Sequence, residues 1–380
     1  MIDQAYFMKI LKDAGVEFFT GVPDSHLNGF CNYLLNNVAE DKHVIAANEG
    51  NAVGIAAGYY YATGTIPLVY MQNSGLGNVI NPLASLTDKH VYRTPLILLI
   101  GWRGEPGSGD HAQHITQGEI TTKLLEMLDI PYIIAEDDDR LLAEQLCPLL
   151  ELAKEERKVV AILGRKGVFA AADKANICDD IYPLRREEAI EAILDVLPAD
   201  SYYFASTGRA TRELYFLREA RHEGHQHDFL NLGAMGHLSS VALGVALANS
   251  ENRVVCLDGD ASALMHMGSF SMACQVDAPN FLHIILNNGA HESVGGQPSA
   301  GCQLDFTTIA AGSGYNTVGH AVTTKAELEE ALQKLSLGTG PSFIDFRIRK
   351  GLKGSLPPLQ INPEQLITNL MDQLARQEED

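Results

Sequence analysis

Two groups of oxygen-bearing side chains follow two apolar runs in the second half of the chain. Asp258-Gly259-Asp260 follows the run Arg253–Leu257, and Asn287-Asn288-Gly289 follows the run Phe281–Leu286. If both runs are parallel strands, their ends meet at the sheet edge where α/β proteins bind ligands. The 27 residues between Asp260 and Asn288 are about the length of one βαβ crossover, so both side chains can reach one point. Carboxylate and amide oxygens suit a cation such as Mg²⁺.

Each group alone has a simpler interpretation. Asp260 could cap a helix, and Asn287-Asn288-Gly289 could form a turn. Together, at this spacing and after two strands, the two groups predict a magnesium site that holds a diphosphate. Gly259 and Gly289 would let the backbone turn closely around such a ligand.

Glu49 is a second candidate, in the first half of the chain. It lies in VIAANEGNAVGIAAGYYYATG, directly after a predicted strand and in apolar surroundings. It could serve only as a carboxylate at the N-terminus of a helix, where the helix dipole favours it. Partial burial would raise its pKa and suit a carboxyl group that shares a proton.

Gly259-Asp260 followed one crossover later by Asn287-Asn288 resembles the cofactor motif of thiamine diphosphate enzymes, although Ala261 stands where that family usually has glycine. The resemblance implies that Asp260, the side chain of Asn288 and the carbonyl of Ala290 bind Mg²⁺, which holds the diphosphate of thiamine diphosphate. The stretch around Glu49 resembles the pyrimidine-binding domain of thiamine decarboxylases. By this resemblance Glu49 bonds the aminopyrimidine ring and activates the cofactor.

Two more stretches match cofactor positions of the family. Met235 in Gly233-Ala234-Met235-Gly236 corresponds to the apolar wedge that bends the cofactor, although it could also be a core methionine. Thr207 and Gly208 follow the predicted strand Ser201–Ala205, where a hydroxyl and helix amides suit diphosphate oxygens.

Four stretches resemble the phosphonopyruvate and sulfopyruvate decarboxylases, which lack the middle domain of longer thiamine decarboxylases. They are GVPDSHLNGFCNYL, MQNSGLGNVINPLASL, IGWRGEPG with QHITQGEIT, and NNGAHESVGGQPS. The resemblance covers nearly the whole chain. It departs at His26-Leu27-Asn28 and in the tail RKGLKGSLPPL, both of which could contact the substrate anion.

The resemblance implies non-oxidative decarboxylation of 3-phosphonopyruvate to phosphonoacetaldehyde and CO₂ through a thiamine ylide and an enamine, in phosphonate biosynthesis. The alternative is decarboxylation of sulfopyruvate to sulfoacetaldehyde, or of another 2-keto acid. The single two-domain chain and GWRGEPG favour the phosphonate. A thiamine carboligase or a keto-acid dehydrogenase component would retain the enamine for a second acceptor, and nothing in the sequence indicates an acceptor or lipoyl partner domain. A regulatory module that merely binds a phosphate ligand would have no use for Glu49.

Related decarboxylases place proton-handling residues where this chain has Asp24 and His114, although a turn residue and a loop histidine remain simpler interpretations. Side chains that could donate to the substrate or its anion are expected to be Ser25, Arg103, Gln113, His291 and Ser293. Lys350, Lys353 and Ser74 are further candidates. Arg103 can offer a bidentate fork to a phosphonate, and a neutral His114 can orient or donate a proton.

Strand and helix patterns alternate along the chain and predict two α/β domains with doubly wound parallel sheets. We expect a pyrimidine-binding domain over residues 1–167, a linker over 168–183 and a diphosphate-binding domain over 184–380. The expected strands are Val16–Thr20, His43–Ala47, Pro67–Met71, Pro95–Ile100, Val159–Leu163, Ser201–Ala205, Arg253–Leu257, Phe281–Leu286 and Ser342–Arg347. Helices are expected between these strands, and one of them is expected to run without a break over Met265–Gln275.

The net charge of −20 argues against nucleic acid as a general partner. The six cysteines form no CxxC pair, which fits free thiols in a reducing compartment. The N-terminus does not read as a signal peptide, and no apolar run approaches a membrane span of roughly 20 residues. We therefore expect a cytoplasmic protein that binds no membrane. The family resemblance implies a homodimer or higher oligomer with active sites shared between subunits.

Overall fold

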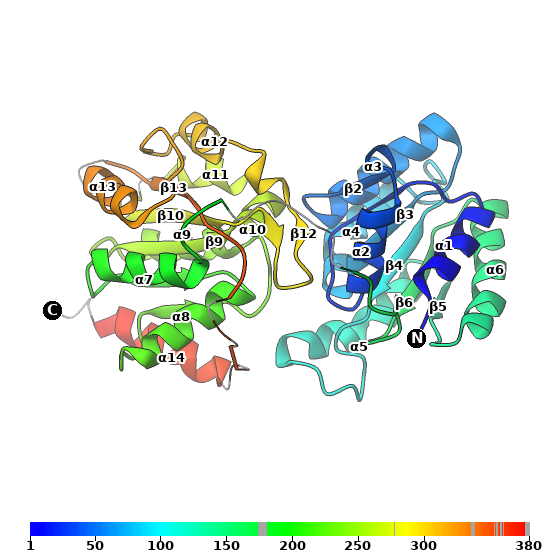
Figure 1. Ribbon diagram of the computed structural model, residues 1–380, viewed down its shortest axis with the longest axis horizontal. Coiled ribbons are helices and arrows are strands. Elements are labelled where there is room, and N and C mark those ends of the chain that lie inside the picture. Colours follow the sequence, from blue (N-terminus) through cyan, green and yellow to red (C-terminus); the bar gives the residue numbers. More distant parts are fainter. Residues whose placement is uncertain are drawn as a thin grey trace. The chain divides into compact units, whose positions relative to one another are not determined.

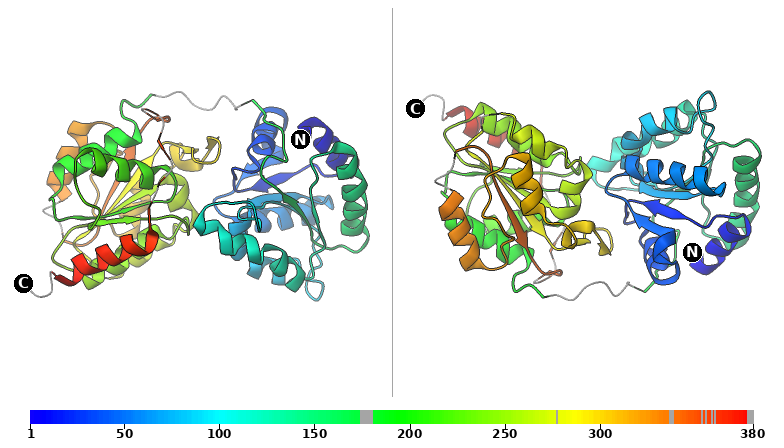
Figure 2. Two further views of the ribbon diagram at one scale, coloured as in Figure 1. Left: turned by 90° about the horizontal axis from the view of Figure 1, so that it is seen from below. Right: turned by 90° about the horizontal axis from the view of Figure 1, so that it is seen from above.

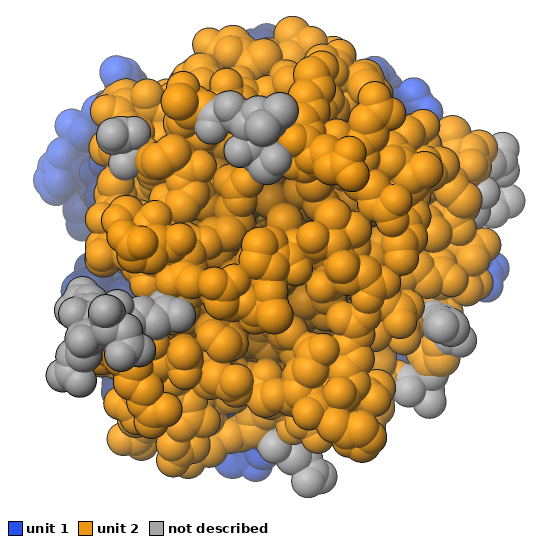
Figure 3. All heavy atoms as spheres, turned by 90° about the vertical axis from the view of Figure 1, so that its left-hand side faces the viewer, with its two compact units in different colours: residues 1–177, 293–298 blue, residues 178–292, 299–380 orange. Residues whose placement is uncertain are grey.

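A computed structural model describes residues 1–173, 181–276, 278–335, 339–352, 354, 356–357, 359 and 361–376. The chain divides into two compact units, which Figure 3 colours separately. Unit 1 comprises residues 1–177 and 293–298, and unit 2 comprises residues 178–292 and 299–380. Part of the expected linker 168–183, including Cys178, lies outside the described residues. The expected domain boundaries at 167 and 184 therefore stay a prediction.

The core of unit 1 is a six-stranded parallel sheet in the order β2-β1-β3-β4-β6-β5. Its strands are β1 (Phe19–Gly21), β2 (His43–Ile45), β3 (Leu68–Gln72), β4 (Ile97–Gly101), β5 (Tyr132–Ile134) and β6 (Val160–Gly164). Its helices are α1 (Gln4–Asp13), α2 (Asn28–Asn37), α3 (Glu49–Thr63), α4 (Leu76–Ser85), α5 (Ala112–Met127) and α6 (Asp139–Glu155), with short 3₁₀ turns η1 (Glu40–Lys42) and η2 (Asn73–Gly75).

The core of unit 2 is a five-stranded parallel sheet in the order β13-β10-β9-β7-β8. Its strands are β7 (Tyr202–Ala205), β8 (Asp228–Leu230), β9 (Val254–Gly259), β10 (Phe281–Asn287) and β13 (Ser342–Arg347). Its helices are α7 (Arg186–Val196), α8 (Arg209–Ala220), α9 (Leu238–Ala248), α10 (Asp260–Met265), α11 (Ser269–Ala273), α12 (Phe306–Ser313), α13 (Lys325–Leu335) and α14 (Pro363–Arg376). The short elements β11 (Ala290–His291), β12 (Gln297–Pro298) and η3 (Ala300–Cys302) follow β10.

Helices cover both faces of each sheet, so every sheet has an apolar core on either side (Figures 1 and 2). Alternate residues of a strand enter opposite cores, because successive side chains point to opposite faces. In β9, Val255 and Leu257 join the core under α7, α8 and α13, whereas Val254 and Cys256 join the core under α9, α11 and α12. This double burial explains the continuous apolar runs in the sequence and confirms the predicted fold class of two doubly wound parallel sheets.

The structure differs from the expected elements in several places, among them the unexpected strand β8 and the start of β1 at Phe19 where Val16 was expected. The helix expected over Met265–Gln275 is wrong, because α10 ends at Met265 and α11 begins only at Ser269. Strand β9 runs on to Gly259, so that Asp260 is the first residue of α10. Strand β5 was not expected, because Tyr132–Ile134 is a short run at the sheet edge. Among the described helices, none is long and apolar enough to cross a membrane.

Candidate functional site

Glu49 begins α3 and is only 4% exposed. Its Oε2 accepts a hydrogen bond of 2.7 Å from the side-chain amide of Asn78. A Cβ atom at Gly75 would lie 2.5 Å from Oε1 of Glu49, so glycine leaves room for the carboxyl group there. Burial raises the pKa of Glu49, and the Asn78 hydrogen bond opposes that rise. The result is a buried carboxyl group that can hold a proton more readily than an exposed one.

Asp24 lies beyond the end of β1, is fully buried, and accepts hydrogen bonds at both of its oxygens. Its Oδ1 accepts a hydrogen bond of 2.7 Å from the side-chain amide of Gln72, and its Oδ2 accepts one of 2.6 Å from the backbone N–H of His26. Gln72 in turn accepts from the hydroxyl of Ser74. A Cβ atom at Gly101 would lie 2.2 Å from Oδ2 of Asp24, so the carboxylate sits directly against the end of β4.

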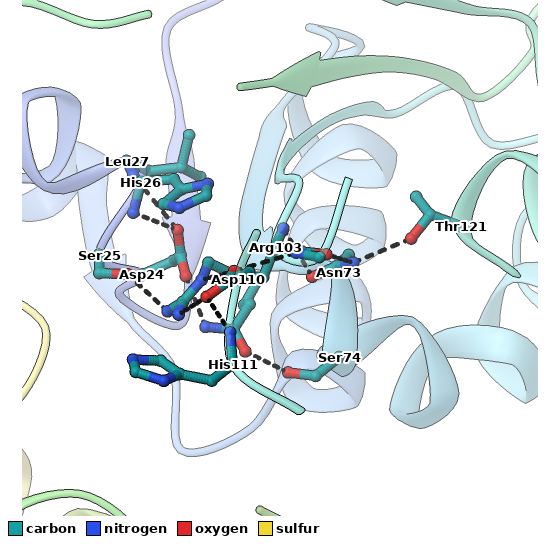
Figure 4. A network of polar contacts seen from close by, with 12 residues as sticks. Asp24, Ser25, His26, Leu27, Asn73, Ser74, Arg103, Asp110, His111 and Thr121 are labelled. Carbon is teal, nitrogen blue, oxygen red and sulfur yellow. Dashed lines mark hydrogen bonds and ion pairs between the residues drawn. The ribbon is translucent and has the colours of Figure 1, made fainter. Parts of the chain in front are cut away.

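Arg103 is held in the same group of polar side chains (Figure 4). Its Nε and Nη2 donate to the two oxygens of Asp110 at 2.6 and 2.7 Å, and its Nη1 donates to Ser25 Oγ at 3.1 Å. Asp110 also accepts from the backbone of Gly104 and His111. Hydrogen bonding to Arg103 holds the pKa of Asp110 well below its usual range. Arg103 has five N–H hydrogens, so two of them remain for a further acceptor.

His114 and Gln113 lie in the first turn of α5, beside the loop that Arg103 and Asp110 fasten. Burial, with the nearby charge of Arg103, lowers the pKa of His114 to about 4. The imidazole is therefore neutral at pH 7 and carries one N–H and one acceptor nitrogen. Gln113 is exposed. The structure thus groups Asp24, Ser25, Ser74 and Arg103 in one hydrogen-bonded network, with His114 on the adjoining helix.

Asp260 begins α10 in unit 2 and is 2% exposed. Its Oδ2 accepts a short hydrogen bond from the hydroxyl of Ser299, and the backbone of Asn288 lies within hydrogen-bonding reach of the carboxylate. Burial raises the pKa of Asp260 to about 6, although these hydrogen bonds oppose the rise. Among the described residues, no lysine, arginine or histidine forms an ion pair with it. A buried carboxylate of this kind is well suited to a metal cation, which would offset its desolvation.

Asn288 follows β10 and is also buried. Its Nδ2 donates a hydrogen bond of 3.0 Å to Oε2 of Glu292, and its Oδ1 accepts one of 3.1 Å from the backbone N–H of Ala290. The carbonyl of Ala290 accepts 2.9 Å from the backbone N–H of Glu292. The strand ends therefore bring Asp260 and Asn288 together, as expected from their spacing.

The predicted diphosphate residues lie on loops of unit 2. Thr207 and Gly208 follow β7, and Gly208 has a φ of 102° immediately before α8. Gly259 ends β9, and Gly233 and half-buried Met235 lie between β8 and α9. Ala261 is buried in the first turn of α10, and nothing in the structure explains why alanine stands there.

The remaining candidates for the substrate anion are less closely grouped. Burial lowers the pKa of His291 to about 4, so its ring is neutral at pH 7. Ser293 is exposed and belongs to unit 1, whereas His291 belongs to unit 2. Lys350 lies just after β13, and Lys353 lies outside the described residues.

Sequence reasoning missed several polar partners of the predicted site residues. Asn78, Gln72, Asp110 and Ser299 each donate to, or accept from, one of these residues. Gln72 ends β3, so its position at a strand end was a usable signal. The other three come from loops or from a neighbouring helix, whose pairing depends on tertiary packing.

Two family models match this chain, one in each half. The model "Thiamine pyrophosphate enzyme, N-terminal TPP binding domain" matches residues 4–125. The model "Thiamine pyrophosphate enzyme, C-terminal TPP binding domain" matches residues 206–346. Together they span Glu49 and Asp24 in the first half and Asp260 and Asn288 in the second.

Curated relatives match almost the whole chain. The chain is 33% identical over 382 residues to a phosphonopyruvate decarboxylase of Streptomyces viridochromogenes, covering 96% of this chain and 93% of that protein. It is 32% identical to a phosphonopyruvate decarboxylase of Streptomyces hygroscopicus, covering 96% and 92%. It is 28% identical to a sulfopyruvate decarboxylase of Methanosarcina acetivorans, covering 94% of each chain.

Proposed function

Because this chain belongs to the thiamine diphosphate-dependent decarboxylases, in the family of phosphonopyruvate and sulfopyruvate decarboxylases, we propose that it decarboxylates 3-phosphonopyruvate to phosphonoacetaldehyde and CO₂. The observation that carries the choice of substrate is 33% identity to a phosphonopyruvate decarboxylase along 96% of the chain. We place this reaction in phosphonate biosynthesis, as the resemblance to phosphonopyruvate decarboxylases implies.

Mg²⁺ would be held by Asp260, by the side-chain oxygen of Asn288 and by the carbonyl of Ala290. The carboxylate of Asp260 is buried and forms no ion pair with any of the described residues. This supports the assignment, because a cation would offset the desolvation of the carboxylate. Gly259, Ala261, Thr207, Gly208 and Gly233 would line the diphosphate. Met235 would be the apolar residue that contacts the cofactor as its wedge.

When bound, thiamine diphosphate supplies an electron sink for the bond that breaks as CO₂ leaves. Glu49 would hydrogen-bond the aminopyrimidine ring, and its raised pKa suits a carboxyl group that holds a proton there. Asn78 donates to Oε2 of Glu49, which fixes the direction of the carboxyl group and keeps Oε1 for the cofactor.

Asp24 and His114 would handle the proton that the product acquires. Three donors, from Gln72, His26 and Leu27, fix the Asp24 carboxylate in one orientation. The neutral imidazole of His114 can donate from one ring nitrogen and accept at the other.

Arg103 would bind the phosphonate through the two N–H hydrogens that Asp110 and Ser25 leave, with help from Ser25, Gln113, His291 and Ser293. Asp110 balances the single positive charge of the Arg103 guanidinium, so further donors or cations would be needed to balance the charge of a phosphonate.

A homodimer or higher oligomer is proposed because two helices leave apolar faces open to solvent. In α3 the residues Gly54, Ile55 and Gly58 are exposed, and in α9 the residues Val241 and Leu247 are exposed. A Cβ atom at Gly54 or Gly58 would meet nothing within 4 Å inside the chain, which leaves room for a close partner helix. We further propose a cytoplasmic location, in keeping with free thiols at the described cysteines.

Sulfopyruvate is the second candidate substrate. The sulfopyruvate decarboxylase of Methanosarcina acetivorans aligns along 94% of its own length, so a single two-domain chain does not distinguish the two substrates. The preference for phosphonate therefore rests on the higher identity and on GWRGEPG.

The proposal is tested with purified protein, thiamine diphosphate and Mg²⁺, offered phosphonopyruvate, sulfopyruvate or pyruvate separately while aldehyde formation is followed. We expect turnover of phosphonopyruvate that is lost after removal of metal by EDTA and restored by Mg²⁺. Turnover of none of the three acids would contradict decarboxylation of a 2-keto acid of this class.

A further inference from the structure

The carboxylate of Glu292 is the point where several donors of unit 2 converge. The side-chain amide of Asn288 donates to it at 3.0 Å, and Arg209 pairs with it at 2.9 Å. Arg186 forms a short ion pair with it, and the backbone N–H of Gly351 also donates to it. Its side chain is only 10% exposed, so these contacts are made largely out of water.

The hydrogen bond from Asn288 to Glu292 determines the orientation of the Asn288 side-chain amide. The two ends of an asparagine amide have nearly the same shape, so sterics alone distinguish them poorly. An ionised carboxylate has only acceptors, so it must face the NH₂ group and not the oxygen. Glu292 therefore directs Oδ1 of Asn288 to the other side, where the backbone N–H of Ala290 also donates to it.

Two arginines make both oxygens of Glu292 acceptors. Arg209 pairs with Oε1 at 2.9 Å, and Arg186 pairs with Oε2, the oxygen that also accepts from Asn288. Arg186 also pairs with buried Glu213, and within the described part of the chain Glu213 forms no hydrogen bond with Asn288. The backbone N–H of Glu292 donates a hydrogen bond of 2.9 Å to the carbonyl of Ala290. Glu292 therefore contacts both Asn288 and Ala290, the two proposed Mg²⁺ ligands other than Asp260.

We propose that Glu292 is a positioning residue that presents the oxygen of Asn288 to the divalent cation. The inference rests on the proposed magnesium site and names a residue that determines its geometry. Groups that orient a metal ligand commonly change metal affinity by about 10- to 100-fold when they are removed.

The first test measures magnesium affinity, not turnover. Mg²⁺ is titrated by calorimetry into wild-type protein and Glu292→Gln in the presence of thiamine diphosphate. The glutamine amide can donate as well as accept, so Asn288 is no longer held in one orientation, and we expect the apparent Kd for Mg²⁺ to rise about 10- to 100-fold. Glu213→Gln is the matched control, because Glu213 is a buried partner of the same Arg186, and we expect its Kd to stay within about threefold of wild type.

The second test exchanges the donor and the acceptor. In the double variant Asn288→Asp with Glu292→Gln, the amide stands at position 292 and the carboxylate at position 288, so the hydrogen bond is kept with its direction reversed. The net charge of the cluster is also kept, which preserves folding if Glu292→Gln alone unfolds. We expect the double variant to bind Mg²⁺ at least about tenfold more tightly than Glu292→Gln, because position 288 again offers the metal an oxygen.

The outcomes separate this inference from the proposed function. If wild-type protein shows no magnesium-dependent binding of thiamine diphosphate, the magnesium site and the positioning role both fail. If wild type binds and Glu292→Gln binds Mg²⁺ equally tightly, only the positioning role is overturned. A double variant that binds Mg²⁺ no more tightly than Glu292→Gln would likewise overturn it.

Discussion

The side-chain amide of Gln72 donates a hydrogen bond of 2.7 Å to Oδ1 of Asp24. Gln72 ends β3 and Asp24 lies beyond β1, so neighbouring strands of one sheet supply the two partners. The backbone N–H groups of His26 and Leu27 hold Oδ2. Gln72 therefore sets the orientation of a buried carboxylate to which we give a role in proton handling.

Replacing Gln72 by leucine removes the donor to Oδ1 of Asp24 while keeping a similar volume. A hydrogen bond to a charged group contributes about 1.5–3 kcal/mol, so we expect kcat to fall by roughly 10- to 100-fold. Binding of thiamine diphosphate, measured by calorimetry, should be unchanged. Ser85→Ala is the control, because it removes a serine hydroxyl that donates to the carbonyl of Asn81 within α4, and it should change kcat by less than about threefold. A Gln72→Leu enzyme with wild-type kcat would show that Asp24 needs no such orientation.

Glu49→Gln should abolish most turnover and leave the fold intact. The amide cannot hold the acid proton, and loss of a positioned acid or base costs about 10²- to 10⁴-fold in rate. The control is Glu364→Gln in the first turn of α14, which removes a helix N-terminal carboxylate far from any predicted site residue in sequence. If Glu49 served only the helix dipole, both variants would lose a little stability and keep their activity.

Arg103→Lys tests the proposed phosphonate contact. Lysine cannot hold Asp110 in a fork and donate to a second acceptor in the same plane. We expect KM for phosphonopyruvate to rise by about tenfold or more, with kcat/KM for pyruvate nearly unchanged, because pyruvate lacks the phosphonate. Steady-state kinetics with both acids measure this. An equal loss for both substrates would mean that Arg103 serves only to fasten the loop to Asp110.

We expect His43 to make the free energy of unfolding of unit 1 depend on pH. Burial lowers its pKa to about 4, and Nε2 lies 2.9 Å from the hydroxyl of Tyr70. An unfolded histidine titrates near 6.5, so between about pH 6.5 and 4 the unfolded chain binds a proton that the folded chain does not. Stability should therefore fall as the pH drops through this window, by at most about 1.4 kcal/mol per pH unit from this group.

The comparison is made by urea unfolding at pH 7 and pH 5 for wild type and His43→Gln. The variant should lose less stability than wild type between the two pH values, because glutamine does not titrate. The same loss in both proteins would mean that His43 does not contribute.

Most of the fold could be predicted from the sequence, because parallel strands buried on both faces appear as continuous apolar runs. Strand β13 begins and ends at the predicted residues Ser342 and Arg347. The helix expected over Met265–Gln275 breaks because Gly268 interrupts it and α11 begins at Ser269, a break that its apolar pattern does not reveal.

The proximity of the predicted site residues could be inferred where residue type and strand-end position coincide, whereas their roles stay predictions. The spacing of Asp260 and Asn288 indicated that they lie close together, because the register pairs Leu286 of β10 with Gly259 of β9 and so brings the strand ends together. The partner Asp110 could not be found this way. It comes from the loop before α5, and only folding of that loop places it against Arg103.

The most direct test of the central claim is a competition between the two candidate substrates. Equal concentrations of phosphonopyruvate and sulfopyruvate are supplied together to the enzyme with thiamine diphosphate and Mg²⁺, and both aldehydes are quantified by mass spectrometry during early turnover. The product ratio equals the ratio of kcat/KM values. We predict that phosphonoacetaldehyde predominates; a predominance of sulfoacetaldehyde would contradict the proposed substrate.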